Sequence, residues 1–260
     1  MNTVTTQRLL PHLLSLTLFL GSIFFPPLAR AESGAGTHVF TFDETDRIKE
    51  LIVETLMERP EILIEMSELL QQRQAQEKKE NARSAILSNR ERLFEDDNAP
   101  VLGNPDGDVT VVEFFDYNCP YCKKATGPLK ELIGTDGGVR LVYREWPILN
   151  EGSVFAAKAA LASQAQGKYE EFHWALMDLK RVTRDSTPEL AASIGLDIDK
   201  LQADMEAPRI NKHIEDSMTL ARELGFSGTP SFVIGEETAP GLIPLEELRR
   251  LGQLQRESAS

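Results

Sequence analysis

The sequence predicts an α/β fold whose strand-and-helix core carries a helical insertion and follows an N-terminal helical segment. Three observations support this prediction. An apolar strand-like run, Val109 to Phe115, leads into a helical pattern at Cys119. A long helical stretch, residues 152–225, separates that half from a short strand at 231–234. Residues 43–95 have helical rather than strand periodicity.

The first residues have the pattern of a secretory signal. The chain has 260 residues, enough for one good-sized domain and an appendage. Residues 1–31 contain Arg8, an apolar run at 13–25 and the A-x-A motif Ala29-Arg30-Ala31. An uncleaved membrane anchor is the alternative, although the run is shorter than the about 20 residues of a bilayer span. We therefore expect a cleaved signal peptide and an exported protein.

The charge and the cysteine content of the chain exclude some kinds of protein. Without residues 1–31, 26 Lys and Arg oppose 41 Asp and Glu, a net charge of −15. Such a surface repels nucleic acid and anionic lipid, so we expect no nucleic-acid partner. The chain has only 2 cysteines, whereas a small exported protein that is held together by disulfides usually has more. One pair in an oxidising compartment is better explained by redox turnover.

Residues 32–97 form the predicted N-terminal helical segment. After a flexible start, Asp43 is the expected N-cap of a first helix, which Arg59-Pro60 ends because the residue before proline avoids the α region. A second helix is expected from Pro60 to about Glu95. Its apolar stripe begins with Leu63, Met66 and Leu70. It is interrupted over residues 71–83, where the side chains are polar apart from alanines, and then continues.

A helix this long cannot bury such stripes by itself. We expect residues 43–95 either to self-associate, as a dimer or trimer, or to serve as a solvated linker with small docking patches.

Residues 98–255 form the predicted main domain. Turn residues at 98–107 precede the strand at Val109–Phe115, which is apolar enough for burial on both faces. A helix with an expected kink at Pro128 follows, and then a strand at 139–143. After the insertion come strands at 231–234 and near Thr238 and a helix from Pro244 to about Leu251. This order is that of a thioredoxin-type core with inserted helices.

Cys119 and Cys122 form a C-x-x-C motif at the expected strand-to-helix junction. Disulfide exchange needs a thiolate nucleophile and a second thiol that resolves the mixed disulfide. Cys119 at the helix N-terminus would have its thiolate stabilised by free backbone N–H groups and the helix dipole. Cys122, one turn later, is the expected resolving thiol. Pro120 and Tyr121 would fix the turn and contact substrate.

Other uses of two cysteines are a structural disulfide or a metal site. A structural disulfide rarely spans four residues at a helix start. Zinc needs about four ligands, and His38, His173 and His213 show no spacing that points to the motif. Two-coordinate Cu(I) on the thiolate pair stays open. We expect no resident metal and no cofactor.

Thr229-Pro230, within Gly228-Thr229-Pro230-Ser231-Phe232, is the second site element. We expect this peptide bond to be cis, which would place the backbone of Thr229 beside the sulfurs, where it could pair with an extended substrate. The alternative is an ordinary trans proline that opens a strand.

Glu113 is the third site candidate, because it interrupts an apolar strand six residues before Cys119. A buried carboxyl would have a raised pKa and could relay the proton of Cys122. Alternatively, Glu113 points to an exposed edge. Asp116, Lys123 and Lys124 are expected only to tune the electrostatics, and His173 to be a packed or surface residue.

These motifs together resemble the DsbA-like thiol:disulfide interchange family. The resemblance covers residues 98–255 and is carried by Val111–Cys122, by Gly167-Lys168-Tyr169 with Phe172-His173, and by Gly228–Gly235. With the helices of residues 43–95, the chain looks closer to the ScsC (suppressor of copper sensitivity) and Com1-like branch.

The resemblance implies a periplasmic enzyme that forms or isomerises disulfides in reduced or misoxidised exported proteins and is reset by a DsbB- or DsbD-like membrane partner. It also supports Glu113 as the buried acid. Pro120-Tyr121 replaces the Pro-His of the strongest oxidants, and Thr229 precedes the proline as in isomerase branches. Oxidase and isomerase both stay open, and a Cu(I)-binding or chaperone protein is the rival.

Overall fold

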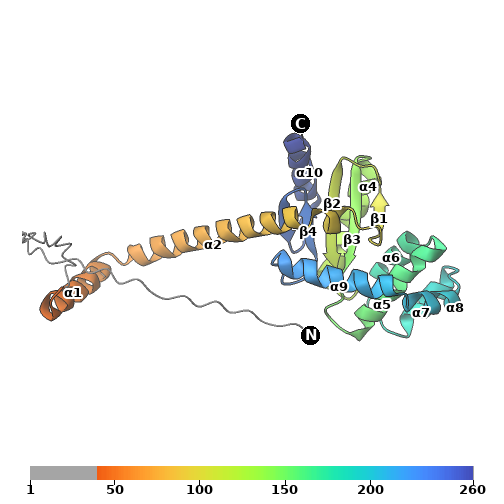
Figure 1. Cartoon of the computed structure of the whole chain (residues 1–260), viewed down its shortest axis with the longest axis horizontal. Coiled ribbons are helices and arrows are strands. Elements are labelled where there is room, and N and C mark those ends of the chain that lie inside the picture. The colour runs from red at the N-terminus through yellow and green to blue at the C-terminus, as the bar shows by residue number, and fades with distance from the viewer. Residues whose placement is uncertain (1–39, 260) are drawn as a thin grey trace, which may run out of the picture. The chain divides into compact units, whose positions relative to one another are not determined.

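The computed structural model describes residues 40–259, so the signal peptide predicted at residues 1–31 lies outside the described residues. The chain divides into one unit up to Arg59, which contains α1 (Phe42–Glu58), and a second unit from Pro60. The second unit contains, in order, α2 (Glu61–Ser88), α3 (Arg90–Phe94), β1 (Val101–Gly103), β2 (Val109–Phe115), α4 (Pro120–Thr135), β3 (Val139–Glu145), α5 (Glu151–Ser163), the 3₁₀ turn η1 (Gln164–Gln166), α6 (Tyr169–Asp178), α7 (Ser186–Ser193), α8 (Ile198–Met205), α9 (Pro208–Glu223), β4 (Ser231–Ile234), β5 (Glu237–Pro240) and α10 (Leu245–Ala259) (Figure 1).

The first helix, α1, begins earlier than the sequence suggested. The prediction of Asp43 as its N-cap is wrong, because Thr41 is the cap. The Thr41 hydroxyl accepts from the backbone N–H of Glu44, and the Glu44 carboxylate accepts in return from the N–H of Thr41. This reciprocal capping box satisfies two N–H groups that the helix itself cannot bond. No residue of α1 is buried.

The helix predicted from Pro60 to about Glu95 is confirmed up to Ser88 and is wrong only beyond it, since α2 ends at Ser88 and α3 starts at Arg90. Asn89 separates them with φ −115° and ψ 20°. Its side chain donates to the carbonyl of Ala85 and accepts from Arg92, an alternative to helical bonding that asparagine favours.

A five-stranded mixed sheet forms the centre of the second unit, in the order β1-β3-β2-β4-β5. The β2–β3 pair is parallel and the other three pairs are antiparallel. As expected, β2 is central, and every residue of it except Thr110 is buried. The short edge strand β1 was not predicted, because three residues between turns show no alternation.

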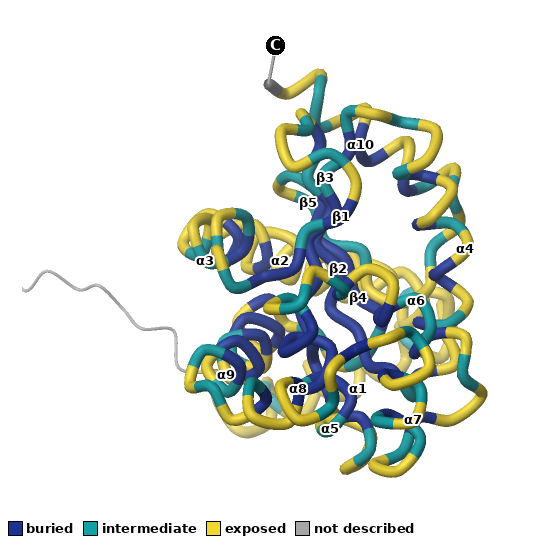
Figure 2. The backbone as a smooth tube through the Cα atoms, turned by 90° about the vertical axis from the view of Figure 1, so that its right-hand side faces the viewer, coloured by how far each residue is buried: buried dark blue, intermediate teal, exposed yellow. Residues whose placement is uncertain are grey.

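Both faces of the sheet are covered, as the burial pattern of β2 requires. Val111 and Phe115 belong to a core that includes residues of α4, α10 and the inserted helices. Val112 and Phe114 belong to a second core, formed with residues of α2, α3 and α9 (Figure 2). The fold is therefore a thioredoxin-like core with a helical insertion, preceded by helices.

The insertion comprises α5 to α9 and packs through small residues. Ala156, Ala159 and Ala160 on α5 are fully buried. Gly152 lies so close to the loop after α6 that a Cβ there would stand 2.6 Å from the carbonyl oxygen of Val182. Small side chains therefore let the elements of the insertion pack closely against one another.

The last helix, α10, was predicted to end near Leu251 and instead continues to Ala259. Arg256 explains the extension, because its guanidinium bonds the carboxylates of Asp108 and Asp136 at 2.8–3.0 Å. Within residues 40–259, no helix combines the length and the apolar character that a bilayer span needs.

Candidate active site

The turn between β2 and α4 places Cys119 at the start of a helix, as predicted. Cys119 is the N-cap of α4 with an extended backbone, and Pro120 occupies the first helical position, where its missing N–H is not needed. The sulfur therefore faces N–H groups of the first turn, which have no acceptor within the helix. Both cysteines are reduced and buried, with Cys119 5% and Cys122 1% exposed.

Hydrogen bonding to the sulfur makes Cys119 an acidic thiol. A hydrogen bond from the Cys122 thiol, followed by bonds from Thr229 and from backbone N–H groups of the first turn, lowers the pKa of Cys119 to about 5 despite its burial. At neutral pH this thiol is therefore largely a thiolate, the form that attacks disulfides.

Cys122 has the opposite character. Burial, its hydrogen bond to the Cys119 sulfur and the negative charge of Glu113 raise the pKa of Cys122 far above that of an ordinary thiol. The two sulfurs thus divide the roles: Cys119 is ionised, and Cys122 keeps its proton and donates a hydrogen bond to it.

The loop before β4 lies against the nucleophile. The Thr229-Pro230 peptide bond is cis, as predicted. The Cys119 thiol, when protonated, donates to the carbonyl oxygen of Thr229 at 3.1 Å. The structure thus brings together the two motifs that lie more than a hundred residues apart in the chain. Their role in holding substrate stays a prediction.

Glu113 is buried and not at an exposed edge. It is 1% exposed, and its register neighbours are Tyr143 on β3 and Phe232 on β4. Among the described residues its Oε1 has no hydrogen-bond partner. Burial and the nearby charge of Cys119 raise the pKa of Glu113 well above its usual range. A carboxyl in this state can hold a proton beside the dithiol at neutral pH.

Asp116 anchors the catalytic turn, a role that the sequence reasoning missed. Its buried carboxylate accepts from the backbone N–H groups of Asn118, Ile148 and Leu149 at 2.7–3.0 Å and from the hydroxyl of Ser153 at 2.7 Å. The expectation that Asp116 only tunes the electrostatics is therefore too narrow. The signal available in the sequence was the aspartate three residues before Cys119, a residue type that commonly bonds the backbone of its own turn.

Asn118, directly before the nucleophile, was also missed. Its side chain bonds both backbone groups of Val182, accepting from the N–H at 2.8 Å and donating to the carbonyl at 2.9 Å. It also donates to Ser153 at 3.1 Å. Nothing in the sequence could show this pairing, because Val182 is 64 residues away.

His173 is a packed residue, in line with the prediction. It is fully buried, its Nδ1 lies 3.0 Å from the hydroxyl of Tyr117, and its ring stacks on Tyr169. Burial lowers the pKa of His173 to about 3, so the ring is neutral. Tyr121, by contrast, is 56% exposed, and the ammonium of Lys124 lies 5.3 Å from its ring centre.

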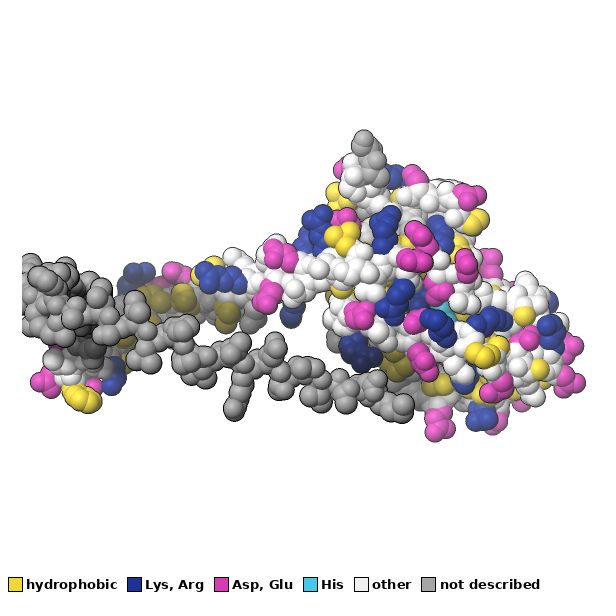
Figure 3. Space-filling view, viewed as in Figure 1, with side chains coloured by type: hydrophobic (Ala, Val, Ile, Leu, Met, Phe, Trp, Pro, Cys, Tyr) yellow, Lys and Arg dark blue, Asp and Glu magenta, His cyan; other side chains and the backbone are white. Residues whose placement is uncertain are grey.

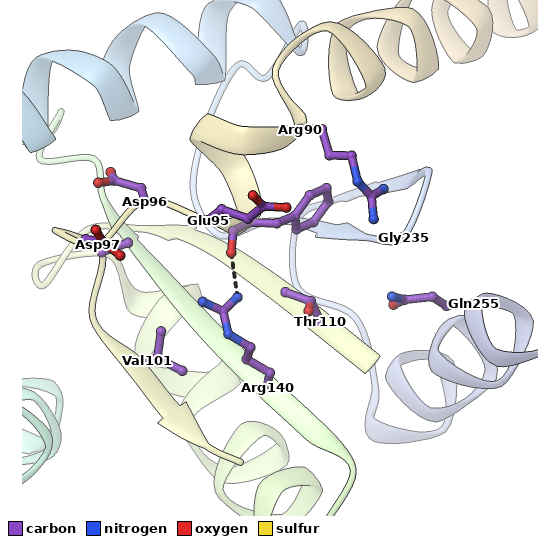
Figure 4. Close-up of a pocket in the computed structure, with 11 residues that line it drawn as sticks. Arg90, Glu95, Asp96, Asp97, Val101, Thr110, Arg140, Gly235 and Gln255 are labelled. Carbon is purple, nitrogen blue, oxygen red and sulfur yellow. Dashed lines mark hydrogen bonds between the residues drawn. The ribbon is translucent and has the colours of Figure 1, made fainter. Parts of the chain in front are cut away.

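A separate cavity of about 570 Å³ lies on the sheet face that bears Thr110, away from the dithiol. Arg140 in its wall donates to the carbonyl of Phe94 at 2.7 Å, and Arg90 and Gln255 lie around the same hollow (Figure 4). It contains no cysteine. Among residues 40–259, no group of three or more His, Cys, Asp or Glu side chains is arranged to hold a metal ion.

The acidic Cys119 makes the stability of the reduced protein depend on pH. Its pKa is about 5 in the folded protein and about 8.5 in an unfolded chain. Because the pKa of Cys119 is lower in the folded protein, its thiolate stabilises the fold fully at pH values above the unfolded pKa. This stabilisation is lost as the pH falls towards the folded pKa. We expect the free-energy difference of unfolding between reduced wild type and Cys119→Ser to shrink from about pH 9 to about pH 5.

Urea titrations of both reduced proteins across this range provide the measurement. The raised pKa of Glu113 acts in the opposite direction, with stabilisation present at low pH and lost as pH rises, but both proteins contain this group. A difference independent of pH would contradict the assignment of Cys119 as the ionised thiol.

Two family profiles match the chain. A DSBA-like thioredoxin domain matches residues 110–251, and the N-terminal domain of the copper resistance protein ScsC matches residues 44–77. The first spans more than half of the chain and includes the dithiol and the cis-proline.

Among solved structures, the chain is similar to a thioredoxin-like oxidoreductase from Silicibacter pomeroyi DSS-3, with 55% identity and a TM-score of 0.64 over 65% of this chain and 98% of the other. It is also similar to Proteus mirabilis ScsC in a transitional conformation, with 26% identity and a TM-score of 0.61 over 84% of this chain and 97% of the other.

Curated relatives include the Na(+)/H(+) antiporter NhaA of Herminiimonas arsenicoxydans, 30% identical over 140 residues. The match covers 52% of this chain but only 22% of that protein. The chain thus spans roughly a fifth of the length of the curated relatives that it matches.

Proposed function

Because the chain belongs to the family of DsbA-like thioredoxin domains, we propose that it is an exported thiol–disulfide oxidoreductase that forms or isomerises disulfide bonds in periplasmic proteins. The observation that carries the proposal is the asymmetry of the dithiol. The pKa of Cys119 is lowered to about 5, whereas that of Cys122 is raised. One ionised and one protonated thiol in contact are what attack followed by resolution requires.

In the oxidising direction the protein begins with a Cys119–Cys122 disulfide. A substrate thiolate attacks the sulfur of Cys119, a mixed disulfide forms, and Cys122 leaves as a thiolate that takes the proton of Glu113. A second substrate thiolate then attacks the substrate sulfur of the mixed disulfide. Cys119 leaves as the stabilised thiolate, and the substrate has lost two electrons to the dithiol.

In isomerisation the reduced protein attacks instead. The Cys119 thiolate opens a wrong disulfide and forms a mixed disulfide, and a different substrate thiolate then displaces Cys119. No net electrons move. If no substrate thiol arrives, Cys122 gives its proton to the Glu113 carboxylate and displaces the substrate, which leaves reduced. A DsbB- or DsbD-like membrane partner would reset the dithiol for the oxidase or the isomerase role, respectively.

Refolding of a test protein distinguishes these roles. The oxidised chain with a reduced substrate measures oxidation, and the reduced chain with a scrambled, fully oxidised ribonuclease measures isomerisation. Recovery of ribonuclease activity in either assay supports the proposal, and its failure in both would refute it. The assay that responds more strongly identifies the role.

The exposed apolar side chains of the N-terminal helices support a proposal of self-association. Leu63, Met66 and Leu70 are 56–60% exposed on α2, where the N-terminal part shows a cluster of hydrophobic side chains (Figure 3). On α1, Leu51 and Ile52 are also about half exposed. Soluble proteins seldom leave such stripes uncovered. We propose that residues 43–95 join copies of this chain into a dimer or trimer, as an isomerase that holds misfolded substrates between its sites would require.

The double substitution Leu63→Glu with Leu70→Glu in the full chain is expected to reduce the assembly to monomers. Each buried leucine contributes about 1.5–3 kcal/mol per copy, and a carboxylate in its place adds repulsion. Light scattering gives the mass, with Glu61→Gln and Glu68→Gln as surface controls on the same helix. An unchanged mass, or a monomeric wild type, would count against self-association through this segment.

A second candidate is a Cu(I)-binding or chaperone protein that uses the same thiols. It is favoured by the match of residues 44–77 with a domain of a copper resistance protein. Two thiolates suffice for linear Cu(I) coordination. Anaerobic Cu(I) titration beside the ribonuclease assay separates the two candidates, because a sequestering protein would bind copper tightly and rescue no ribonuclease.

A further inference from the structure

One short segment of the insertion runs alongside the dithiol. In the chain, the two cysteines lie between Asn118 and Lys123. The Asn118 side chain bonds both backbone groups of Val182 at 2.8 and 2.9 Å. The Lys123 ammonium donates to the carbonyls of Leu176 and Met177 at 3.4 and 3.3 Å. Residues 178–181 connect these two attachments, which lie on either side of the dithiol in the chain.

This segment and the N-terminal part of α4 together carry four basic side chains. Lys180 and Arg181 in the segment are exposed, as is Lys124 in the second turn of α4, and Lys123 is half-buried. These four residues are called the basic rim below. Asp178 is the single acidic residue of the segment.

The rim contrasts with the rest of the protein. The chain has 41 acidic against 28 basic residues, so the four cations of the rim, with Asp178 and Asp116 as nearby anions, run against its overall charge. Among the described residues, the side chains of Lys180 and Arg181 take part in no hydrogen bond or ion pair. Some surface cations of this protein do have carboxylate neighbours, as Lys200 has in Asp204 and Lys212 in Asp216. The charges of Lys180 and Arg181 are therefore available to a partner.

We propose that the basic rim recognises acidic side chains next to the reacting cysteine of a substrate, so that exported polypeptides with Asp or Glu beside a cysteine react fastest. This inference rests on the proposed function, because the partner is the polypeptide that exchanges disulfides with Cys119. Attraction across the rim raises the rate of encounter and orients the substrate thiol toward the sulfur.

The experiment compares two short peptides with one cysteine each, flanked on both sides by Glu in one and by Gln in the other. Each peptide thiolate attacks Cys119 in the oxidised full chain, and the Cys119–Cys122 bond breaks as the mixed disulfide forms. Stopped-flow fluorescence follows this step. Rates are corrected for the thiolate fraction of each peptide and for its rate with a neutral small disulfide.

The Glu peptide is expected to react about threefold to tenfold faster than the Gln peptide at low ionic strength. Because salt screens exposed charges over a Debye length of about 10 Å at 0.1 M and about 3 Å at 1 M, the ratio should approach one at high salt. In the variant Lys180→Gln with Arg181→Gln, the rate of the Glu peptide should fall while that of the Gln peptide stays the same.

The matched control is Lys200→Gln with Lys212→Gln, which removes the same charge from α8 and α9. Its ratio should equal that of the wild type. A wild-type ratio near one, or an equal loss in the control, would overturn the inference and leave the proposed function intact. If neither peptide reduced the disulfide, the proposed function itself would fail.

Discussion

Cys119→Ala is expected to lose disulfide exchange down to the uncatalysed background. Removal of a covalent nucleophile commonly costs about 10³-fold or more, because no neighbouring group replaces it. Cys122 cannot take over, since burial and its contacts raise its pKa far above neutrality. Insulin reduction and ribonuclease refolding provide the measurement.

Cys122→Ala is the matched variant and should behave differently. In this variant Cys119 still attacks and forms a mixed disulfide with the substrate. Unless a second substrate thiol resolves it, this mixed disulfide persists and can be seen by mass spectrometry. The pKa of Cys119 should also rise above about 5, because its largest stabilising hydrogen bond comes from Cys122. An active Cys119→Ala protein, or a Cys122→Ala protein that traps no substrate, would refute the assigned roles.

Glu113→Gln is expected to slow the steps in which Cys122 gains or loses its proton. A positioned general acid or base contributes about 10²-fold to 10⁴-fold. The amide has the same shape but can neither take the proton of Cys122 nor return it. Quenched-flow measurement of mixed-disulfide resolution by Cys122 should show the loss, together with the disappearance of the pH dependence that Glu113 causes.

The control reaction is alkylation of Cys119 by iodoacetamide, which needs no proton transfer at Cys122. The amide cannot carry the negative charge of an ionised carboxyl, so the Cys119 thiolate should form as readily as in the wild type or more so. Unchanged resolution in Glu113→Gln would show that Glu113 is only a buried residue of the strand.

Local sequence signals predicted most of the elements around the site. The apolar run of β2, the C-x-x-C at the start of α4 and the Thr-Pro before β4 each have a signature within a few residues. Errors arose where the signal was short or depended on distant partners. Thr41 replaced Asp43 as the cap through its pairing with Glu44, and α10 extends past Leu251 because Arg256 bonds residues far along the chain.

The environment of the dithiol was less predictable. Glu113 was open to two interpretations, because alternation along a strand does not say which helices cover it. Its burial is settled only by packing on both faces of the sheet. The attachment of Asn118 to Val182 and of Asp116 to the loop before α5 could not be predicted, because each joins residues that are distant in sequence.

The sequence by itself determined the chemistry: two thiols one helical turn apart, a helix that begins at the first of them and a proline-led strand downstream. These are local features, fixed by spacing and by backbone preferences. Tertiary structure decided that a carboxyl is buried beside them and which segment of the insertion is attached on either side of the dithiol. The physical reason is that desolvation and charge–charge interactions depend on distances in space, and these distances exist only once the insertion has packed against the core.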